Sequence, residues 1–227
     1  MEKPALPRAV LFDAYGTLFD VYSVGLAAEQ LFPGAGERLS TLWRDKQIEY
    51  SRLTSMSRRY KPFWELTRSA LRFAAHRLQL ELGAAAEDRL MNEYRHLSPF
   101  PENREVLQQL KARGVRAGIL SNGDPEMLGI AVKSAGFADL LDPVLSVHET
   151  KAYKTDPATY ALGTAALKLP AKHILFVSSN GWDAIGATWF GYTTLWVNRM
   201  GLPLEQLDTQ PTRIGRSLRD VLSFFPD

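Results

Sequence analysis

The feature that most constrains the fold is a series of short apolar runs, each long enough for one buried strand and separated from the next by helical sequence. Five such runs occur, at residues 9–12, 115–120, 143–147, 173–177 and 192–197. The intervening segments 101–112, 124–135, 157–168 and 183–190 have the apolar spacing of helices. Strands that alternate with helices in this way predict an α/β fold with a doubly wound parallel sheet.

One long helical stretch interrupts the alternation after the first strand. Residues 20–97 have an almost entirely helical pattern, which includes the segments 62–77 and 86–96. One face of this stretch, at helical spacing, carries Leu39, Leu42, Trp43, Lys46, Gln47 and Tyr50. We therefore predict a core domain of residues 1–18 and 99–227 and an inserted helical cap domain of residues 19–98. Pro99 and Pro101 mark the return of the chain to the core.

Composition excludes several classes of function. The 27 basic and 25 acidic residues leave a formal net charge of +2 and form no long run of one sign, so neither nucleic acid nor a membrane surface is expected as a partner. The absence of cysteine excludes disulfides, thiolate nucleophiles and cysteine metal sites. The first seven residues do not resemble a signal peptide, and no segment approaches the roughly 20 apolar residues of a membrane span. We therefore expect a cytoplasmic protein.

Polar residues follow three of the predicted strands at the point where each strand ends. The first strand runs into Asp13, the second into 121–124 and the fourth into 178–183. Because the carboxyl ends of parallel strands meet at one crevice, these loops should converge there. Lys154 precedes a predicted helix and should reach the same place. The sequence therefore predicts two carboxylates, one lysine and several hydroxyl and amide groups at a single site.

These residues resemble those of the haloacid dehalogenase superfamily. Four ordered elements carry the resemblance: Asp13-Ala14-Tyr15-Gly16-Thr17, Ser121-Asn122, Lys154, and the acidic loop that ends in Asp183. Finer patterns are similar to those of the (S)-2-haloacid dehalogenases: Phe12 to Asp20, Trp43-Arg44-x-Lys46-Gln47-x-Glu49-Tyr50, Leu120 to Gly123 and Phe176 to Asp183. The resemblance runs from Ala9 to about Leu202 and implies a haloacid dehalogenase-like core with a cap.

Two positions separate this pattern from the phosphatases of the superfamily. A phosphatase needs a second aspartate two residues after its nucleophile to protonate the leaving group, and a fourth-strand aspartate to help hold magnesium. Tyr15 and Ser179 occupy these positions here. A departing halide needs no proton, and a 2-haloacid carries a single charge that a lysine and backbone amides can balance. We therefore expect neither a metal ion nor another cofactor.

The resemblance implies a hydrolase of short (S)-2-haloacids that works through an enzyme ester with inversion to (R)-2-hydroxy acids. Asp13 would attack the halogen-bearing carbon, and water would then hydrolyse the ester at the Asp13 carboxyl carbon. Asp183 is the candidate base for that water, with Ser178 and Asn180 orienting nearby groups. Lys154 would balance the charge of Asp13, and Thr17 would orient it by a hydrogen bond.

Substrate contacts are also implied by the resemblance. Arg44, Asn122 and Trp182 would hold the departing halide, since the arginine charge is diffuse and weakly hydrated. Ser121 and the amides from Asn122 onward would bind the substrate carboxylate. The apolar wall is assigned to Tyr15, Ile48, Phe63 and Trp182, and Tyr160 falls where the family has a tyrosine near the lysine. A homodimer formed through the cap is a further family expectation, with some support from the aromatic residues of 43–64.

Structural alternatives exist for each of these residues. Asp13 and Asp183 could cap turns or helices, and Lys154 could be a surface lysine. Arg44 could belong to a solvated helix face, and the aromatic residues could be core packing. One departure from the family pattern is Thr155, where superfamily members usually carry proline. Another is Asp45, where relatives often carry a neutral side chain; helical geometry turns it about 100° from its neighbour Arg44, so we expect it to face away from the pocket.

Two other functions remain open at this point. One is a magnesium-dependent phosphatase with the same nucleophile, against which Tyr15 and Ser179 argue. The other is a non-catalytic binding protein, which the retained Asp13, Lys154 and Asp183 disfavour. The four histidines, His76, His96, His148 and His173, form no metal-binding spacing and predict neither a metal site nor a catalytic triad.

Overall fold

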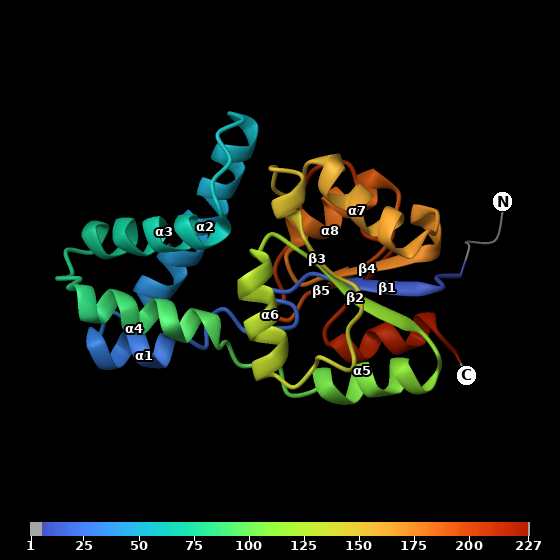
Figure 1. Ribbon diagram of the computed structural model, residues 1–227, viewed down its shortest axis with the longest axis horizontal. Helices are drawn as coiled ribbons and strands as arrows, with labels where there is room; N and C mark the ends of the chain where they lie inside the picture. The colour runs from blue at the N-terminus through green and yellow to red at the C-terminus, as the bar shows by residue number, and fades with distance from the viewer. Residues whose placement is uncertain (1–5, 227) are drawn as a thin grey trace.

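The computed structural model describes residues 6–226 as a parallel sheet with a helical cap beside it (Figure 1). The six strands lie in the order β3-β2-β1-β4-β5-β6, and every pair is parallel. They are β1 (Ala9–Phe12), β2 (Arg116–Ser121), β3 (Val144–Ser146), β4 (Ile174–Ser178), β5 (Thr193–Val197) and β6 (Arg213–Gly215). The predicted α/β class with a doubly wound sheet is confirmed.

Helices cover both faces of the sheet. Helices α7 (Pro157–Leu167) and α8 (Gly181–Phe190) lie on one face, whereas α5 (Asn103–Ala112) and the C-terminal turn η3 (Leu218–Phe224) lie on the other (Figure 1). The remaining core elements are α6 (Pro125–Ser134), η1 (Val147–Glu149) and η2 (Ala171–His173). Since both faces are covered, the central strands are buried along their whole length and therefore consist of apolar residues.

The strand order places β1 at the centre of the sheet. From β1 the chain continues to β2 and β3 on one side and to β4, β5 and β6 on the other. Val10 pairs with Ala117 of β2 and with Leu175 of β4. The carboxyl ends of β1 and β4 therefore flank the point where the winding direction changes, which is where such sheets bind their ligands. Asp13 lies at this point, directly after β1.

Of the helices between β1 and β2, the first four stand together beside the core (Figure 1). They are α1 (Gly25–Leu31), α2 (Gly36–Met56), α3 (Phe63–Arg77) and α4 (Ala84–Arg95). The apolar face of α2 buries Leu39 and Trp43, and the indole nitrogen of Trp43 donates a 2.8 Å hydrogen bond to the Thr67 carbonyl of α3. The predicted apolar face of α2 therefore packs against α3.

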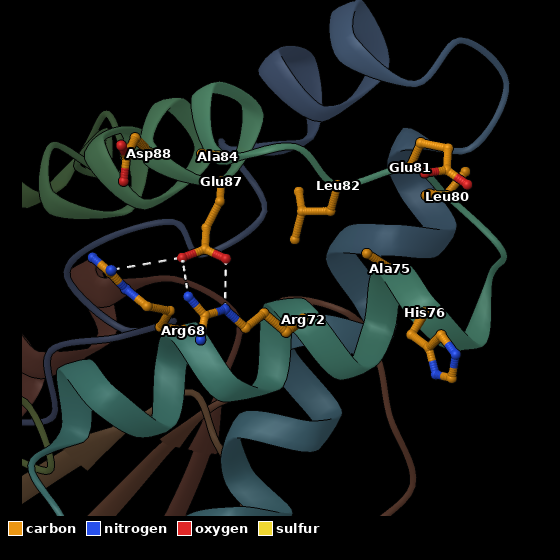
Figure 2. Close-up of a pocket in the computed structure, with 10 residues that line it drawn as sticks. All are labelled: Arg68, Arg72, Ala75, His76, Leu80, Glu81, Leu82, Ala84, Glu87 and Asp88. Carbon is orange, nitrogen blue, oxygen red and sulfur yellow. Dashed lines mark hydrogen bonds and ion pairs between the residues drawn. The ribbon is translucent and has the colours of Figure 1, made fainter.

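An ion-pair cluster joins α3 to α4 on the side of the cap shown in Figure 2. Glu87 of α4 accepts hydrogen bonds of 2.6 Å and 2.8 Å from Arg72 of α3, and Arg68 lies 3.6 Å from the same carboxylate. A bidentate arginine contact fixes direction as well as distance. The cluster therefore sets how α4 lies along α3.

The structure differs from the sequence prediction at β6, and the helices α5 and α8 each begin two residues away from their predicted starts. Strand β6 was not predicted, because it has only three residues and two of them are exposed, so it has no apolar run. Helix α8 begins at Gly181 and not at 183, with Asn180 as the residue before its first turn. Between residues 6 and 226, no helix combines the length and apolar character that crossing a membrane would require.

Candidate active site

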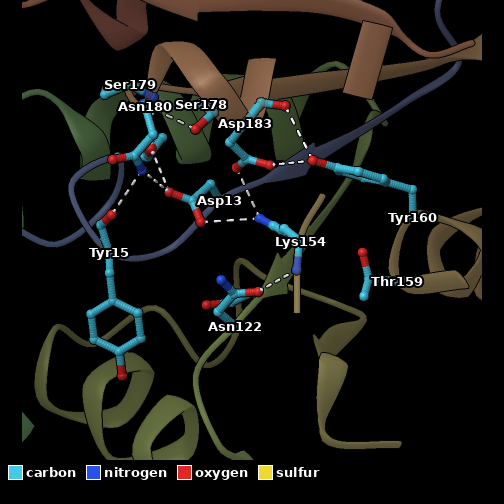
Figure 3. A network of polar contacts seen from close by, with 12 residues as sticks. Asp13, Tyr15, Asn122, Lys154, Thr159, Tyr160, Ser178, Ser179, Asn180 and Asp183 are labelled. Atoms are coloured by element: carbon cyan, nitrogen blue, oxygen red, sulfur yellow. Dashed lines mark hydrogen bonds and ion pairs between the residues drawn. The ribbon is translucent and has the colours of Figure 1, made fainter. Parts of the chain in front are cut away.

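Three side chains hold the carboxylate of Asp13 at the carboxyl end of β1 (Figure 3). Oδ1 accepts a 3.1 Å hydrogen bond from Lys154 Nζ. Oδ2 accepts bonds of 3.0 Å from Thr17 Oγ1 and 2.9 Å from Asn180 Nδ2. Asp13 is only 5% exposed, so these donors replace most of its contact with water. The orientation of the carboxylate is therefore fixed before any ligand arrives.

Local sequence explains this arrangement. The loop after β1 turns at Gly16, whose φ of +93° is readily adopted only by glycine, and the turn brings Thr17 back beneath Asp13. Thr17 Oγ1 also accepts a 2.8 Å hydrogen bond from the backbone N–H of Ser179 in the loop after β4. The β1 and β4 loops are thereby joined directly below the carboxylate.

Lys154 lies between two carboxylates in the interior. Its Nζ is 3.1 Å from Asp13 Oδ1 and 3.0 Å from Asp183 Oδ2, and its side chain is fully buried (Figure 3). Burial lowers the pKa of Lys154, but the charges of Asp13 and Asp183 outweigh that effect and leave the pKa above its usual value. The lysine therefore remains a cation shared by both acids.

Asp183 lies in the first turn of α8 and is completely buried. Burial raises the pKa of Asp183, and Lys154 opposes that rise. The Tyr160 hydroxyl donates a 2.7 Å hydrogen bond to Asp183 Oδ1, opposite the lysine. The arrangement makes Asp183 a more basic carboxylate than one in water, while two donors still hold it in place.

The backbone around Lys154 is tied to the loop after β2. Asn122 Oδ1 accepts a 3.0 Å hydrogen bond from the Lys154 N–H. Thr155 follows at the position where proline was expected from the family pattern, and the Lys154–Thr155 peptide bond is cis. Both ends of Lys154 are therefore held, the backbone by Asn122 and the ammonium by the two acids.

A small cavity opens above Asp13. Its lining residues are Asp13, Tyr15, Arg44, Ile48, Ser51, Phe63, Ser121, Asn122, Asn180 and Trp182. The cavity has a volume of only about 10 Å³, so a ligand must displace some of its walls. A second cavity of about 460 Å³ shares Arg44, Ile48, Asn180 and Trp182 with it. The shared residues form the boundary between the Asp13 carboxylate and the wider outer space.

Arg44 reaches the cavity from α2 of the cap. Nη1 donates 2.7 Å to Gln47 Oε1, and Nη2 donates to the Tyr15 carbonyl at 3.0 Å and to Asn180 Oδ1 at 3.4 Å. Arg44 is 7% exposed, and within residues 6–226 no carboxylate forms an ion pair with it. Exposed Asp45 lines the outer cavity and not the small one. The arrangement offers an unneutralised cation that can bind an anion.

Aromatic rings form one wall of the small cavity. The Tyr15 ring stacks on Tyr94 at 5.7 Å and tilts against Phe63 at 5.8 Å. Burial raises the pKa of Tyr15 far above its usual value, so its hydroxyl remains neutral. Trp182 also lines the cavity, and the Arg52 guanidinium lies 4.8 Å above its ring. The predicted apolar residues therefore do face the space above Asp13.

The other predicted residues lie behind the cavity wall. Thr17 and Lys154 contact Asp13 directly, and Ser178 Oγ accepts a 3.1 Å hydrogen bond from the Asn180 N–H. Tyr160 is fully buried and meets Asp183, so it lies beside the lysine pair and outside the substrate space. All fourteen predicted site residues thus belong to one connected region, with the five non-lining residues beneath it.

Three contributing residues were not predicted. Gln47 orients Arg44, and it is itself held by the Tyr94 hydroxyl at 2.9 Å and by Thr67 at 2.6 Å. The sequence does distinguish Gln47, because it is a polar side chain on the apolar face of its helix. Ser51 lies one turn further along that helix, whereas no local pattern distinguishes Tyr94 from an ordinary core tyrosine. Within residues 6–226, no group of three His, Cys, Asp or Glu residues is arranged to bind a metal ion.

Comparisons with known proteins agree over nearly the whole chain. The family model of the haloacid dehalogenase-like hydrolases matches residues 7–191. The (S)-2-haloacid dehalogenase of Pseudomonas sp. strain YL is 44% identical over 218 residues, 96% of this chain and 94% of that protein. A crystal structure of an L-2-haloacid dehalogenase matches with a TM-score of 0.95 and 59% identity, covering 97% and 99% of the two chains. The L-2-haloacid dehalogenase of Xanthobacter autotrophicus, with chloropropionic acid covalently bound, matches with a TM-score of 0.89 and 36% identity, covering 95% and 97%.

Proposed function

The chain belongs to the haloacid dehalogenase-like hydrolases and, within them, to the (S)-2-haloacid dehalogenases, and on that basis we propose how its site acts. It hydrolyses short (S)-2-haloalkanoic acids to (R)-2-hydroxy acids without a metal ion. The observation that carries this function is Asp13, oriented by three donors at the floor of a cavity whose wall contains the unneutralised Arg44. The covalently bound chloropropionic acid of the Xanthobacter relative supports an ester intermediate.

In the first step, a carboxylate oxygen of Asp13 attacks C2 of the substrate from the side opposite the halogen. The new C–O bond forms as the carbon–halogen bond breaks, and the halide leaves with the bonding electrons. Attack from the back inverts the stereocentre, so an (S) substrate gives an (R) ester. The fixed orientation of Asp13 contributes to the rate because little rotational freedom remains to be lost.

The substrate is held by contacts around the reacting carbon, and Asn122 takes part in two of them. Arg44, Asn122 and Trp182 bind the departing halide, and the absence of a carboxylate partner for Arg44 in the described chain leaves its charge available. The substrate carboxylate lies against Ser121 and Asn122, in the loop that leads to α6. Tyr15, Ile48, Phe63 and Trp182 surround the alkyl group.

In the second step, water attacks the carboxyl carbon of Asp13. Asp183 takes one proton from the water, and the bond from the acyl carbon to the ester oxygen on C2, which came from Asp13, breaks. The released alkoxide takes that proton from Asp183 to become the 2-hydroxy acid, and the second water proton leaves as Asp13 returns to a carboxylate. The raised pKa of Asp183 suits it to this role, and Ser178 and Asn180 position the groups around the water. Lys154 balances the charge that returns to Asp13.

The wider organisation follows the same family pattern. We assign residues 1–18 and 99–227 of the sequence to a core domain and residues 19–98 to the cap; among the described residues, the cap contributes Arg44, Ile48 and Phe63 to the cavity. A homodimer formed through the cap is supported by Leu53 and Met56, which are 53% and 84% exposed near the end of α2.

Turnover of (S)-2-chloropropionate in the presence of a chelator tests the function. We expect equal amounts of chloride and (R)-lactate, with the same rate before and after metal removal. A phosphatase would instead leave the haloacid intact and hydrolyse phosphate esters only with magnesium. A binding protein would release no chloride under either condition, so chelator-sensitive or absent dehalogenation contradicts the assignment.

Substituting Arg44 tests the halide site. Arg44→Lys keeps a positive charge but loses the planar guanidinium that Gln47, Tyr15 and Asn180 orient, so kcat/KM should fall about 10²- to 10³-fold, as for loss of one preorganised donor. Inhibition by added chloride should weaken as well. Arg38→Lys, on an exposed position of the same helix, is the matched control and should retain activity. Unchanged chloride inhibition in the Arg44 variant would show that Arg44 does not bind the departing halide.

A further inference from the structure

Asp124 occupies the capping position of one helix, α6, but its side chain caps another helix. It ends the loop after β2, is 9% exposed and directly precedes α6, yet its side chain forms no capping hydrogen bond with α6. Instead, Oδ1 accepts a 3.0 Å hydrogen bond from the Phe63 N–H and Oδ2 accepts a 2.7 Å bond from the Trp64 N–H. These are the first two residues of α3. A carboxylate of the core domain therefore caps the N-terminus of α3, a helix of the cap domain.

Helix α3 lacks a capping side chain of its own. The residue before it is Pro62, which has no polar side-chain atom to accept a hydrogen bond. The first N–H groups of any helix have no partner within the helix, and a carboxylate interacts favourably with the positive end of the helix dipole. Asp124 supplies both interactions from a position 61 residues away from Phe63 along the chain.

The capped residue is also part of the substrate cavity. The Phe63 ring is 2% exposed and lies 5.8 Å from the Tyr15 ring and 5.9 Å from the Tyr153 ring. The loop that carries Asp124 also contains Asn122, which holds the Lys154 backbone. One loop therefore connects the lysine beside the nucleophile to the aromatic wall on the other side of the cavity.

We propose that Asp124 is a positioning residue that determines how the site fits the substituent on C2 of the substrate. By capping α3 across the boundary between core and cap, it holds Phe63 against the alkyl group. The inference rests on the proposed function for the identity of the substrate. It adds a specificity determinant that never touches the substrate and acts through the backbone of Phe63.

The test compares substrates with and without an alkyl group. Asp124→Asn keeps the shape of the side chain but replaces one acceptor oxygen by an NH₂ group that cannot accept from an N–H. We expect kcat/KM for (S)-2-chlorobutanoate to fall at least about tenfold, whereas kcat/KM for chloroacetate, which has no alkyl group, falls less than about threefold. The change in the ratio of the two values is the diagnostic result, since general destabilisation would lower both alike.

Asp220→Asn provides a matched control. Asp220 Oδ2 also accepts two backbone N–H groups, from Arg216 at 2.8 Å and Ser217 at 3.0 Å, but both lie in the C-terminal part of the core. This variant should leave the ratio unchanged. In a Phe63→Ala background, Asp124→Asn should cause no further change in the ratio, because the residue through which it acts is gone.

Amide hydrogen exchange supplies a readout independent of activity. Exchange at Phe63 and Trp64 should accelerate in Asp124→Asn and stay at the wild-type rate in Asp220→Asn. If the asparagine variant does not fold, Asp124→Glu replaces it in both experiments. A wild-type protein that releases no halide contradicts the proposed function. An active wild type whose substrate ratio and Phe63 exchange are unaltered by the Asp124 substitution overturns this inference alone.

Discussion

Asp13→Asn should lose essentially all dehalogenase activity, on the order of 10⁴-fold or more, the scale seen when a catalytic nucleophile is removed. An amide oxygen is a poor nucleophile, and the ester to the substrate carbon cannot form. The fold should survive, because Asn keeps the volume of the side chain and Lys154 retains Asp183 as an anionic partner. Halide release measures the loss, and thermal unfolding checks the fold. Asp142→Asn, at an exposed side chain of the core, is the matched control and should be fully active.

A single turnover in ¹⁸O-labelled water examines the same residue in the wild-type enzyme. Hydrolysis at the carboxyl carbon of Asp13 puts the label from water into that carboxylate, so the peptide containing Asp13 should gain mass. The first molecule of product should contain no label, because its hydroxyl oxygen comes from the enzyme. Label in the first product and none in the peptide would mean that water attacks the substrate directly.

Lys154→Met should destabilise the protein as well as inactivate it. Removing the ammonium leaves Asp13 and Asp183 as two buried acids that share no counter-charge, and breaking a buried pair of this kind typically costs about 3–5 kcal/mol. Denaturant unfolding at neutral pH measures this loss. Adding Asp183→Asn to the methionine variant should recover part of the stability, since one of the uncompensated charges is removed.

The stability loss in Lys154→Met should depend on pH in a direction set by Asp183. Lys154 opposes the rise in the Asp183 pKa caused by burial, so the pKa of Asp183 should rise further in the variant. A carboxylic acid whose pKa is higher in the folded than in the unfolded protein favours folding as the pH falls towards that pKa. The difference in unfolding free energy between wild type and variant should therefore shrink on acidification. A difference that stays constant with pH would argue against charge repulsion as its cause.

The central sheet was predictable because its strands carry their own signal. Strands β1 and β4 are buried on both faces, so each is a continuous apolar run that ends in polar residues. Strand β6 lies at the sheet edge and is held by its pairing with β5, an interaction that leaves no pattern in three half-exposed residues. Local sequence thus predicts β1 and β4 far better than β6, whereas the other edge strand, β3, was predicted because it lies within the apolar run at 143–147.

The site was predictable to the extent that its residues occur in motifs. Asp13 follows β1 directly, Asn180 lies in the short loop after β4, and Asp183 lies in the first turn of the helix that this loop begins, so parallel-sheet geometry brings them to one edge of the sheet. Arg44 lies on a charged helix and was found only through its resemblance to family patterns, because nothing local indicates that it points into the core. Asp124 was noted as a strand-end residue, but its partner Phe63 lies in the cap, and no spacing rule connects the two. A contact such as this one, between the core and the cap, leaves no pattern in the sequence around either residue.

The chain leaves the core and returns to it at one place. The Asp20 N–H donates a 2.9 Å hydrogen bond to the Ser98 carbonyl, and Phe19 pairs with Pro99, so the two crossings run side by side. An insertion whose ends meet can be exchanged as a single cassette without altering the path of the core. Recombining residues 20–98 among relatives would transfer Arg44, the proposed halide ligand, together with the Phe63 wall, while the proposed nucleophile Asp13 and Lys154 stay unchanged. We expect such chimaeras to retain most function when the core residue at position 124 can cap the incoming α3. Position 124 is therefore the first core residue to choose when they are designed.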